Sequence, residues 1–185
     1  MPKIILFNGP PRSGKDTAAR MFSNLFIGKQ FSFAEELKNA THTIFGLNGI
    51  RFDHFEDFKN SKIAAFNGMS PREAYIWVSE EIMKPKFGKD IWGKRLARKI
   101  KEYNYSKYAI SDLGFDEEAL YIVNIFGPEN VSIAQIYRPD CDYSNDSRKY
   151  VTIEGRGVKH FRIDNNQGLE HLKKEVLDLG EALGL

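Results

Sequence analysis

The sequence predicts a three-layer α/β fold, in which helices cover both faces of a parallel central sheet. Segments of strand character alternate with helical segments along the chain, which is typical of parallel sheets built with right-handed crossovers. The first strand, residues 4–7, is a continuous apolar run, as expected for a strand that is covered on both faces. A glycine-rich turn follows this strand directly, and a helix follows the turn.

The elements of the first half follow from the spacing of apolar residues. After the turn they recur at three- and four-residue steps and predict a helix with one buried face, formed by Ala18, Met21, Phe22, Leu25 and Phe26. Residues 30–33 predict a short second strand, and a helical stripe over residues 37–45 follows. Residues 70–73 combine an N-cap serine, a proline at the first helical position and a glutamate three residues after the cap, so a helix begins there. Its inner face is predicted to hold Ala74, Trp77, Val78 and Ile82.

The alternation continues in the second half. A helix begins near Asp90, and a strand at residues 108–112 has Asp112 at its C-terminal end. A helix from about Asp116, strands at 131–137 and 158–163, and a helix from 169 to about 183 complete the pattern. The strongest loop candidates are residues 46–70 and 138–150. We expect residues 1–185 to form a single domain, because a chain of this length builds one sizeable core.

Composition excludes several classes of protein. The 27 Lys+Arg and 25 Asp+Glu give a net charge of +2, so nucleic acid is not an expected partner. No window approaches the roughly 20 apolar residues of a spanning helix, so no membrane association is expected. The single cysteine, Cys141, excludes an internal disulfide and a cysteine-rich metal site, and the cytoplasm is the expected location.

The turn after the first strand, GPPRSGKDT, is the sharpest motif. Gly9, Gly14 and Lys15 match G-x-x-x-x-G-K, in which N–H groups at a helix N-terminus and the lysine hold nucleotide phosphates. The alternative is a glycine-rich turn with a solvated lysine. Asp16 stands where the usual pattern has a hydroxyl ligand of magnesium. Since Mg²⁺ accepts carboxylate oxygen and often keeps several waters, Asp16 can hold the hydrated ion. ATP and Mg²⁺ are therefore the expected cofactors.

Several segments together resemble the deoxynucleoside monophosphate kinases of bacteriophages, within the P-loop nucleotide-kinase superfamily. They are GPPRSGKDT at 9–17, SFAEELK at 32–38, SPREAYIWVSEE at 70–81 and GKDIWGKRL at 88–96. SDLGFDEE at 111–118, IYRP at 136–139 and DNNQGLEHL at 164–172 follow in the expected order. Relative to adenylate-kinase-like enzymes, Asp16 stands in the place of a glycine and Thr17 is kept. Residues 46–70 have no counterpart that we can match.

The resemblance implies a fold and an activity. The parallel sheet would carry a helical acceptor-binding insertion at about residues 34–104 and a small lid at about 138–150. The enzyme would transfer the γ-phosphoryl group of ATP to a deoxynucleoside monophosphate, giving the diphosphate. The location would be the host cytoplasm if the protein is phage-encoded, and a homodimer is left open.

The resemblance also assigns roles on the donor side. The phosphate-binding residues would be Gly9, Arg12, Ser13, Gly14, Lys15, Asp16 and Thr17, and Asn165 would contact adenine. Asp16 would position magnesium, and Asp112 would either position it through water or orient the acceptor phosphate. Arg138 or Arg148 would be a closing arginine of the lid. Asp112 has an alternative interpretation as a strand-end aspartate. The family's usual segment has an arginine near this aspartate, which residues 113–115 lack.

On the acceptor side, the resemblance points to Ser32, Lys38, Arg72, Trp92 and Arg95 as substrate-binding residues. Arg72 suits a phosphate because its planar guanidinium binds in a bidentate manner. The alternatives are a solvated helix position for Arg72, Lys38 and Arg95, and a core position for Trp77 and Trp92.

Two other functions stay open at this point. One is another P-loop phosphotransferase, acting on a dephospho-cofactor or on the 5′ end of a polynucleotide. The other is a nucleotide-binding regulator or packaging module that uses ATP as a switch. A kinase needs an acceptor pocket and a mobile lid, for which residues 32–38, 70–95 and 138–148 are candidates.

Overall fold

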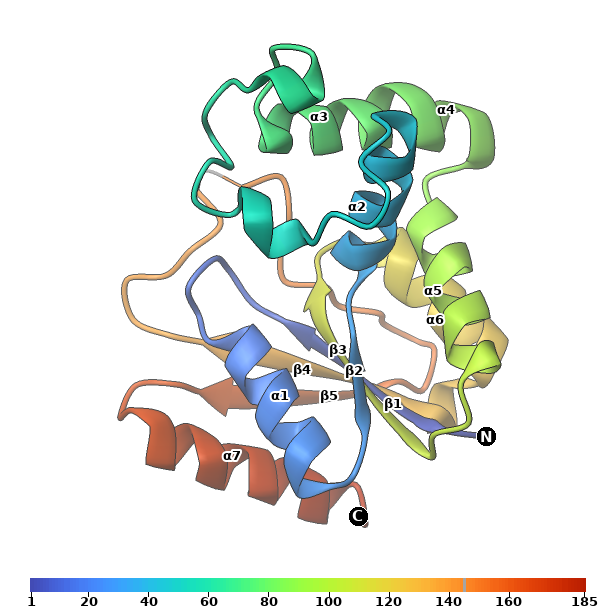
Figure 1. Cartoon of the computed structure of the whole chain (residues 1–185). Coiled ribbons are helices and arrows are strands. Elements are labelled where there is room, and N and C mark those ends of the chain that lie inside the picture. Colours follow the sequence, from blue (N-terminus) through green and yellow to red (C-terminus); the bar gives the residue numbers. More distant parts are fainter. Residues whose placement is uncertain (145) are drawn as a thin grey trace. The chain divides into compact units, whose positions relative to one another are not determined.

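The computed structural model describes residues 1–144 and 146–185 of the chain. Its strands and α-helices, in chain order, are β1 (Lys3–Asn8), α1 (Lys15–Leu25), β2 (Lys29–Phe31), α2 (Phe33–Ile44), α3 (Pro71–Trp77), α4 (Lys84–Phe87), α5 (Ile91–Glu102), β3 (Lys107–Leu113), α6 (Asp116–Phe126), β4 (Val131–Tyr137), β5 (Lys159–Asp164) and α7 (Leu169–Ala182) (Figure 1). The chain forms two compact units. The sheet unit is residues 1–33 and 93–185, and the helical unit is residues 34–92.

The sheet unit contains a five-stranded sheet in the order β2-β3-β1-β4-β5. Every neighbouring pair of strands is parallel, which confirms the predicted parallel sheet. The central strand β1 pairs with β3 on one side and β4 on the other, although these lie about a hundred residues further along the chain. The predicted strand at 30–33 ends earlier, at Phe31, because Phe33 already begins α2.

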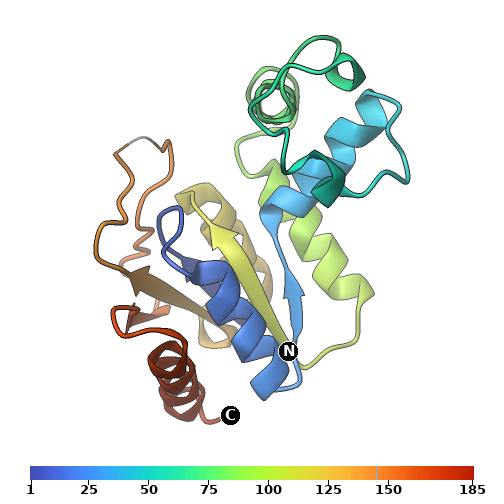
Figure 2. The same cartoon turned by 60° about the vertical axis from the view of Figure 1, so that its left-hand side comes forward.

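Helices cover both faces of the sheet, α1 and α7 on one and α5 and α6 on the other (Figures 1 and 2). Residues of β1 alternate between the two layers, and Ile5 and Phe7 belong to the core cluster that includes Phe22 of α1 and Val176 of α7. Gly180 allows α7 to approach α1, since a Cβ atom there would collide with the ring of Phe26. The predicted three-layer α/β fold is confirmed, and the continuous apolar run of β1 is explained by this double cover.

The helical unit has a small aromatic core of its own. Phe55, Phe66 and Ala74 are buried together, with further rings packed around them. The predicted start of α3 is confirmed in detail: the Ser70 hydroxyl accepts from the Glu73 N–H at 3.2 Å, and the Ser70 N–H donates to the Glu73 carboxylate at 2.8 Å. This reciprocal pair satisfies donors that the helix start would otherwise leave without partners.

Two predictions for the helical unit need correction. The helix that begins at Pro71 continues as a π-helical segment, Val78–Met83, and the wider turn shifts the side chains away from regular α-helical spacing. The predicted inner position of Trp77 is wrong, because 40% of its surface is exposed. Residues 46–70 are also more ordered than a plain loop, since they contain the 3₁₀ turns Phe52–Phe55 and Ala64–Phe66, each of which buries a phenylalanine.

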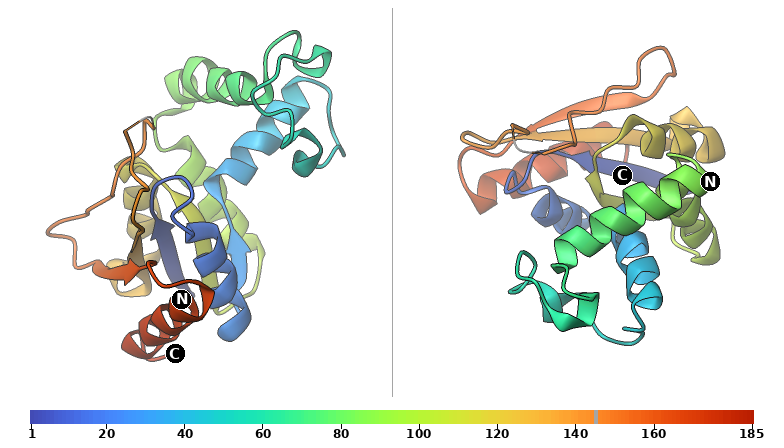
Figure 3. Two further views of the ribbon diagram at one scale, coloured as in Figure 1. Left: turned by 90° about the vertical axis from the view of Figure 1, so that its left-hand side faces the viewer. Right: turned by 90° about the horizontal axis from the view of Figure 1, so that it is seen from above.

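The views in Figure 3 show how the carboxyl ends of the sheet strands and the N-terminus of α1 meet at one edge of the sheet unit. In open parallel sheets this edge is where ligands bind. Within residues 1–144 and 146–185, no helix has sufficient length and apolar character to cross a membrane.

Candidate phosphate-binding site

The turn between β1 and α1 has the backbone of an anion cradle. Arg12 and Gly14 both have positive φ, 64° and 96°, and the Ser13 N–H closes the turn on the Pro10 carbonyl at 3.2 Å. Gly14 is required twice over. Its φ is unfavourable for other residues, and a Cβ atom would come within 2.5 Å of the Asn165 amide nitrogen. The turn then leads into the eleven-residue helix α1, whose first N–H groups and dipole favour a negative ligand.

Two residues of the turn are packed against each other beneath it. A Cβ atom on Gly9 would lie 2.6 Å from the Ser13 hydroxyl and 3.0 Å from the Ile136 carbonyl, so only glycine fits there. The Ser13 hydroxyl is fully buried and has no hydrogen-bond partner among the described residues. A buried hydroxyl of this kind is costly unless a ligand or water completes its hydrogen bonding.

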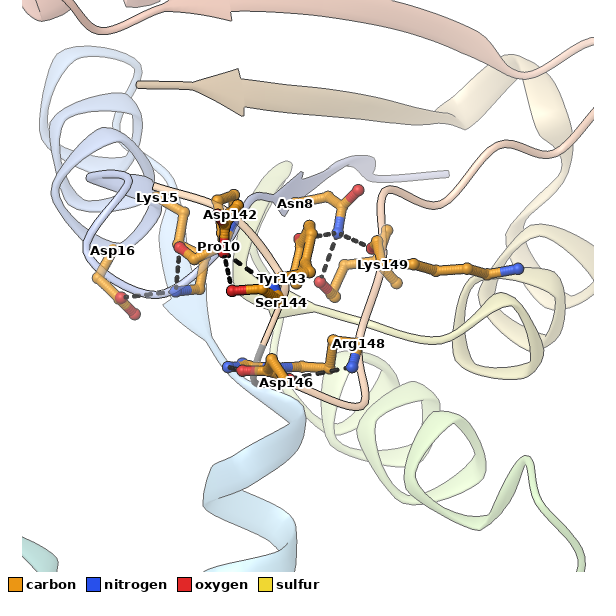
Figure 4. Close-up of polar contacts among 11 residues, drawn as sticks. Asn8, Pro10, Lys15, Asp16, Asp142, Tyr143, Ser144, Asp146, Arg148 and Lys149 are labelled. Carbon is orange, nitrogen blue, oxygen red and sulfur yellow. Dashed lines mark hydrogen bonds and ion pairs between the residues drawn. The ribbon is translucent and has the colours of Figure 1, made fainter. Parts of the chain in front are cut away.

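Lys15 places a positive charge inside this turn. The residue is only 7% exposed, and its ammonium lies 3.5 Å from the Pro10 carbonyl and 3.7 Å from the Asp16 carboxylate (Figure 4). The Asp16 side chain is 71% exposed, so it reaches the solvent beside the turn rather than the core. Thr17 is half-buried one residue further on.

Residues from the other end of the chain hold the turn. The side-chain amide of Asn165 donates to the Ser13 carbonyl at 2.8 Å, and the Asn165 N–H donates to the Tyr137 carbonyl at 2.8 Å. The Arg138 guanidinium donates to the Arg12 carbonyl at 3.1 Å. The ends of β4 and β5 therefore brace the turn, and two predicted site residues, Arg138 and Asn165, lie against it.

A cavity of about 570 Å³ opens beside the turn. Its lining joins the turn to the residues after β4 and β5: Arg12, Gly14, Thr17, Arg138, Pro139, Asp140, Cys141, Asn165, Asn166, Gly168, Leu169 and Leu172. An adjoining cavity of about 400 Å³ shares lining residues with the first, among them Arg138 and Cys141. It is bordered by Tyr137 and Tyr150, whose rings stack at 4.4 Å, and burial raises the pKa of Tyr150 to about 12. The first cavity has the volume of a small-ligand pocket.

The second predicted arginine, Arg148, is used differently from Arg138. Its guanidinium pairs with the Asp146 carboxylate through Nε, at 2.8 Å, and through Nη2 (Figure 4). This hydrogen bonding raises the pKa of Arg148, and the charge of Asp112 contributes to the rise. The side chain lies over Gly114, so the region of residues 113–115, which lacks an arginine in the sequence, receives one from a distant segment.

Asp112 has the structural partner that its strand-end position suggested. One carboxylate oxygen accepts from the backbone N–H of Phe33, the first residue of α2, at 2.8 Å. Asp112 therefore ties β3 to the point where the chain leaves β2. This contact agrees with the interpretation of Asp112 as a structural residue at the end of a strand. A catalytic role for Asp112 is a proposal.

The candidates for the acceptor are distributed over both units. Ser32 follows β2 and Arg95 is half-buried on α5, both in the sheet unit, whereas Lys38, Arg72 and Trp92 belong to the helical unit. Lys38 pairs with Glu56 at 3.1 Å, and Arg72 is exposed in the first turn of α3. Trp92 is 3% exposed and donates its indole N–H to the Ser79 hydroxyl at 3.0 Å, which fits the core interpretation and not a stacking platform.

Asn8 is a residue of this region that sequence reasoning missed. It is fully buried at the end of β1, directly before the turn, and bonds to β3 and to the segment after β4. The available clue was a polar residue ending an otherwise apolar strand.

Comparison with known proteins adds information on the fold. No family model matches the sequence, and no curated protein matches it. A sugar kinase from Janibacter sp. is similar in structure, with TM-score 0.52 and 12% identity over 100% of this chain and 98% of that chain. A shikimate kinase from Acinetobacter baumannii, solved with shikimate, has TM-score 0.51 and 13% identity over 100% and 94% of the two chains. A protein from Thermus thermophilus has TM-score 0.54 and 13% identity over 98% of this chain and 97% of that chain. The chain therefore shares with these structures an α/β fold, in which helices flank a parallel central sheet.

Proposed function

We propose that the protein is an ATP-dependent kinase that transfers the γ-phosphoryl group to a small-molecule acceptor. The observation that supports this most directly is the anion cradle of residues 9–15, with the buried Lys15 inside it and a cavity of about 570 Å³ beside it. The cradle suits a phosphate chain, and the cavity is large enough for a nucleoside. The fold shared with a sugar kinase and a shikimate kinase supports phosphoryl transfer as the activity.

The chain's own residues can perform the donor half of this reaction. The N–H groups of the turn and the start of α1 bind the phosphates, and Lys15 neutralises charge that develops on the transferring group. Arg138, which already contacts the turn, adds a second cation beside the cavity. Asn165 keeps the turn in its binding conformation through the Ser13 carbonyl.

The residues present also fit magnesium. The carboxylate of Asp16 is exposed at the first turn of α1, with Thr17 next to it, and such a site suits an ion that keeps several waters and takes its other ligands from phosphate. The unpartnered Ser13 hydroxyl in the same turn indicates that the turn is completed by a ligand. When bound, the ion would neutralise charge on the phosphates. We assign Asp16 to it, with Asp112 as a more distant, water-mediated contributor.

For the acceptor, we propose a deoxynucleoside monophosphate. The support is the resemblance of the segments at 32–38, 70–81 and 88–96 to phage deoxynucleoside monophosphate kinases, together with the exposed position of Arg72. Arg72 and Lys38 would bind the acceptor phosphate. The segment 138–150, of which residue 145 lies outside the described residues, would act as the lid.

A panel assay tests the activity. ATP turnover is measured by a coupled assay with each ribo- and deoxynucleoside monophosphate, and with shikimate, a set of sugars and an oligonucleotide 5′ end. We expect turnover that depends on one or more deoxynucleoside monophosphates. Turnover with shikimate or a sugar alone would support the kinase activity and contradict the proposed acceptor. Turnover that needs no acceptor would contradict the kinase activity and support an ATP-driven switch.

The cysteine gives a separate test of the nucleotide site. Cys141 is the only cysteine in the sequence and lines both cavities, so its alkylation by iodoacetamide reports on the donor pocket alone. We expect ATP or ADP to slow the alkylation about tenfold or more at saturation, since a filled pocket shields the thiol. Unchanged alkylation under saturating nucleotide would place the nucleotide elsewhere.

A further inference from the structure

The side chain of Asn8 connects segments that are far apart in the sequence. Its amide nitrogen lies 2.8 Å from the Leu113 carbonyl, 3.0 Å from the Lys149 carbonyl and 3.1 Å from the Tyr143 hydroxyl (Figure 4). Its amide oxygen accepts from the Val151 N–H at 2.8 Å. One buried amide at the end of β1 therefore joins the end of β3 to residues on both sides of the tip of the segment that follows β4.

Both ends of this amide take part in hydrogen bonds. Two N–H hydrogens face three acceptors, so at least one is shared, and the oxygen has its own donor. Only a carboxamide supplies both functions at this position. Aspartate would turn the donating end into a second acceptor facing the Leu113 and Lys149 carbonyls, and alanine would remove the hydrogen bonds that Asn8 makes to these carbonyls and to the Val151 N–H.

The position of Tyr143 determines where the preceding residues can go. Residues 138–142 form a short stretch between Tyr137, the last residue of β4, and Tyr143, which Asn8 holds. This stretch contains Arg138, Pro139 and Cys141, each of which borders both cavities. A five-residue stretch with both ends fixed has little freedom, so the contact of Arg138 with the Arg12 carbonyl is favoured in advance.

We propose that Asn8 is a positioning residue, which fixes the Tyr143 end of the stretch 138–142 and thereby holds Arg138 beside the phosphate-binding turn. The functional part of this inference rests on the proposed kinase activity. The contacts of Asn8 are with the chain itself, so its effect on phosphoryl transfer passes through Arg138. Arg148, paired with Asp146 over Gly114, would instead hold the far side of the segment to the end of β3.

Amide hydrogen exchange tests the positioning without any assay of activity. The Val151 N–H donates to Asn8, so Asn8→Ala should speed its exchange about tenfold or more, while amides in α7 keep their rates. Asn24→Ala, at an exposed position on α1, is the matched control and should change neither the exchange rate of the Val151 N–H nor the rates in α7. Unchanged exchange at Val151 in Asn8→Ala would overturn the proposal.

A double-mutant cycle tests the path through Arg138. We expect Asn8→Ala to raise the KM for ATP about tenfold with a smaller effect on kcat, because the ordering of Arg138 must then be supplied by binding. A merely structural defect would lower the apparent kcat at unchanged KM. In an Arg138→Ala background, Asn8→Ala should add little, and fully additive effects would overturn the proposal.

Tyr143→Phe covers the case in which Asn8→Ala does not fold. It removes one hydrogen bond and keeps the ring contact with Tyr150, so a smaller rise in the KM for ATP is expected, again absent in the Arg138→Ala background. An unchanged KM in Tyr143→Phe would count against the proposal. If the wild-type protein transfers no phosphoryl group, the proposed function fails, and the exchange experiment still decides whether Asn8 positions the segment.

Discussion

The side chain of Arg148 lies across the backbone of Gly114, so closely that a Cβ atom on this glycine would come within 2.5 Å of both Cγ and Cδ of the arginine. These atoms belong to the inner part of the side chain, which cannot swing aside without moving the guanidinium away from Asp146. The glycine after β3 is therefore explained by the arginine that packs on it, and its φ angle is not of the kind that needs glycine.

Gly114→Ala should destabilise the protein by about 1–3 kcal/mol, because the added methyl overpacks the contact with Arg148. The free energy of unfolding is measured by urea denaturation. In an Arg148→Ala background the obstructing atoms are gone, so the same change should cost much less. Equal costs in both backgrounds would mean that some other neighbour excludes the methyl group.

Asp112→Asn separates two roles of this residue. Asparagine keeps an oxygen that accepts from the Phe33 N–H but removes the charge that also acts on Arg148, so it should cost less stability than alanine does. Asp112→Ala removes both and should cost about 1 kcal/mol in stability, as for other helix-start acceptors. Phosphoryl transfer should fall in both variants. Full transfer by Asp112→Asn would leave this aspartate with the structural role alone.

Lys15→Ala should lower phosphoryl transfer about 100- to 1000-fold, which is the usual cost of removing a group that stabilises charge in the transition state. The fold should be kept, as measured by circular dichroism and the unfolding midpoint. Lys173→Ala, at an exposed position of α7, is the control and should transfer normally. Near-normal transfer by Lys15→Ala would refute the assignment of the turn as the donor site.

His42 should make the stability of the protein depend on pH. It is buried among the rings of Phe52, Phe55, Phe66 and Tyr75. Burial lowers its pKa from 6.5, and the charge of Lys38 lowers it further. As the pH falls below about 6.5, His42 becomes protonated in the unfolded chain while it stays neutral in the folded chain. The free energy of unfolding should therefore fall as the pH drops below about 6.5.

Urea denaturation at pH 5.5 and pH 7.5 measures this dependence. His42→Gln should reduce the difference between the two values, whereas His54→Gln, at an exposed position, should leave it unchanged. A difference that survives in His42→Gln would have to come from other groups.

The sheet and the site were predictable to different degrees from the sequence. The apolar run of β1, the glycine turn and the amphipathic α1 are local patterns, and the capping box at Ser70 is local as well, so all were found. Trp77 was misplaced because its three-residue step from the buried Ala74 was read as part of the same inner face, whereas 40% of its surface is exposed. The π-helical segment Val78–Met83 that follows it was not predicted either. Spacing rules do not foresee this widening of the turn.

The long-range contacts of the site were beyond sequence patterns. Nothing local indicates that Asn8 bonds to Tyr143, Lys149 and Val151. Nor does it indicate that Arg148 lies over Gly114, because these pairs are set by how distant strands meet. The same holds for Asn165, whose hydrogen bond to Ser13 joins opposite ends of the chain. The sequence offered both Arg138 and Arg148 as the closing arginine of the lid. In the structure Arg138 bonds to the Arg12 carbonyl of the turn, whereas Arg148 pairs with Asp146.

The strand order also bears on how the protein is made. The turn at residues 9–15 leaves the ribosome before β3 and β4, so β1 has no partner in the sheet until β3 has emerged and lacks its second neighbour until residues 131–137 follow. The brace from Asn165 comes later still. The turn therefore stays unsupported until Asn165 has been made, and if it is the proposed donor site, a ribosome-stalled series should first retain ATP when Asn165 is outside the exit tunnel.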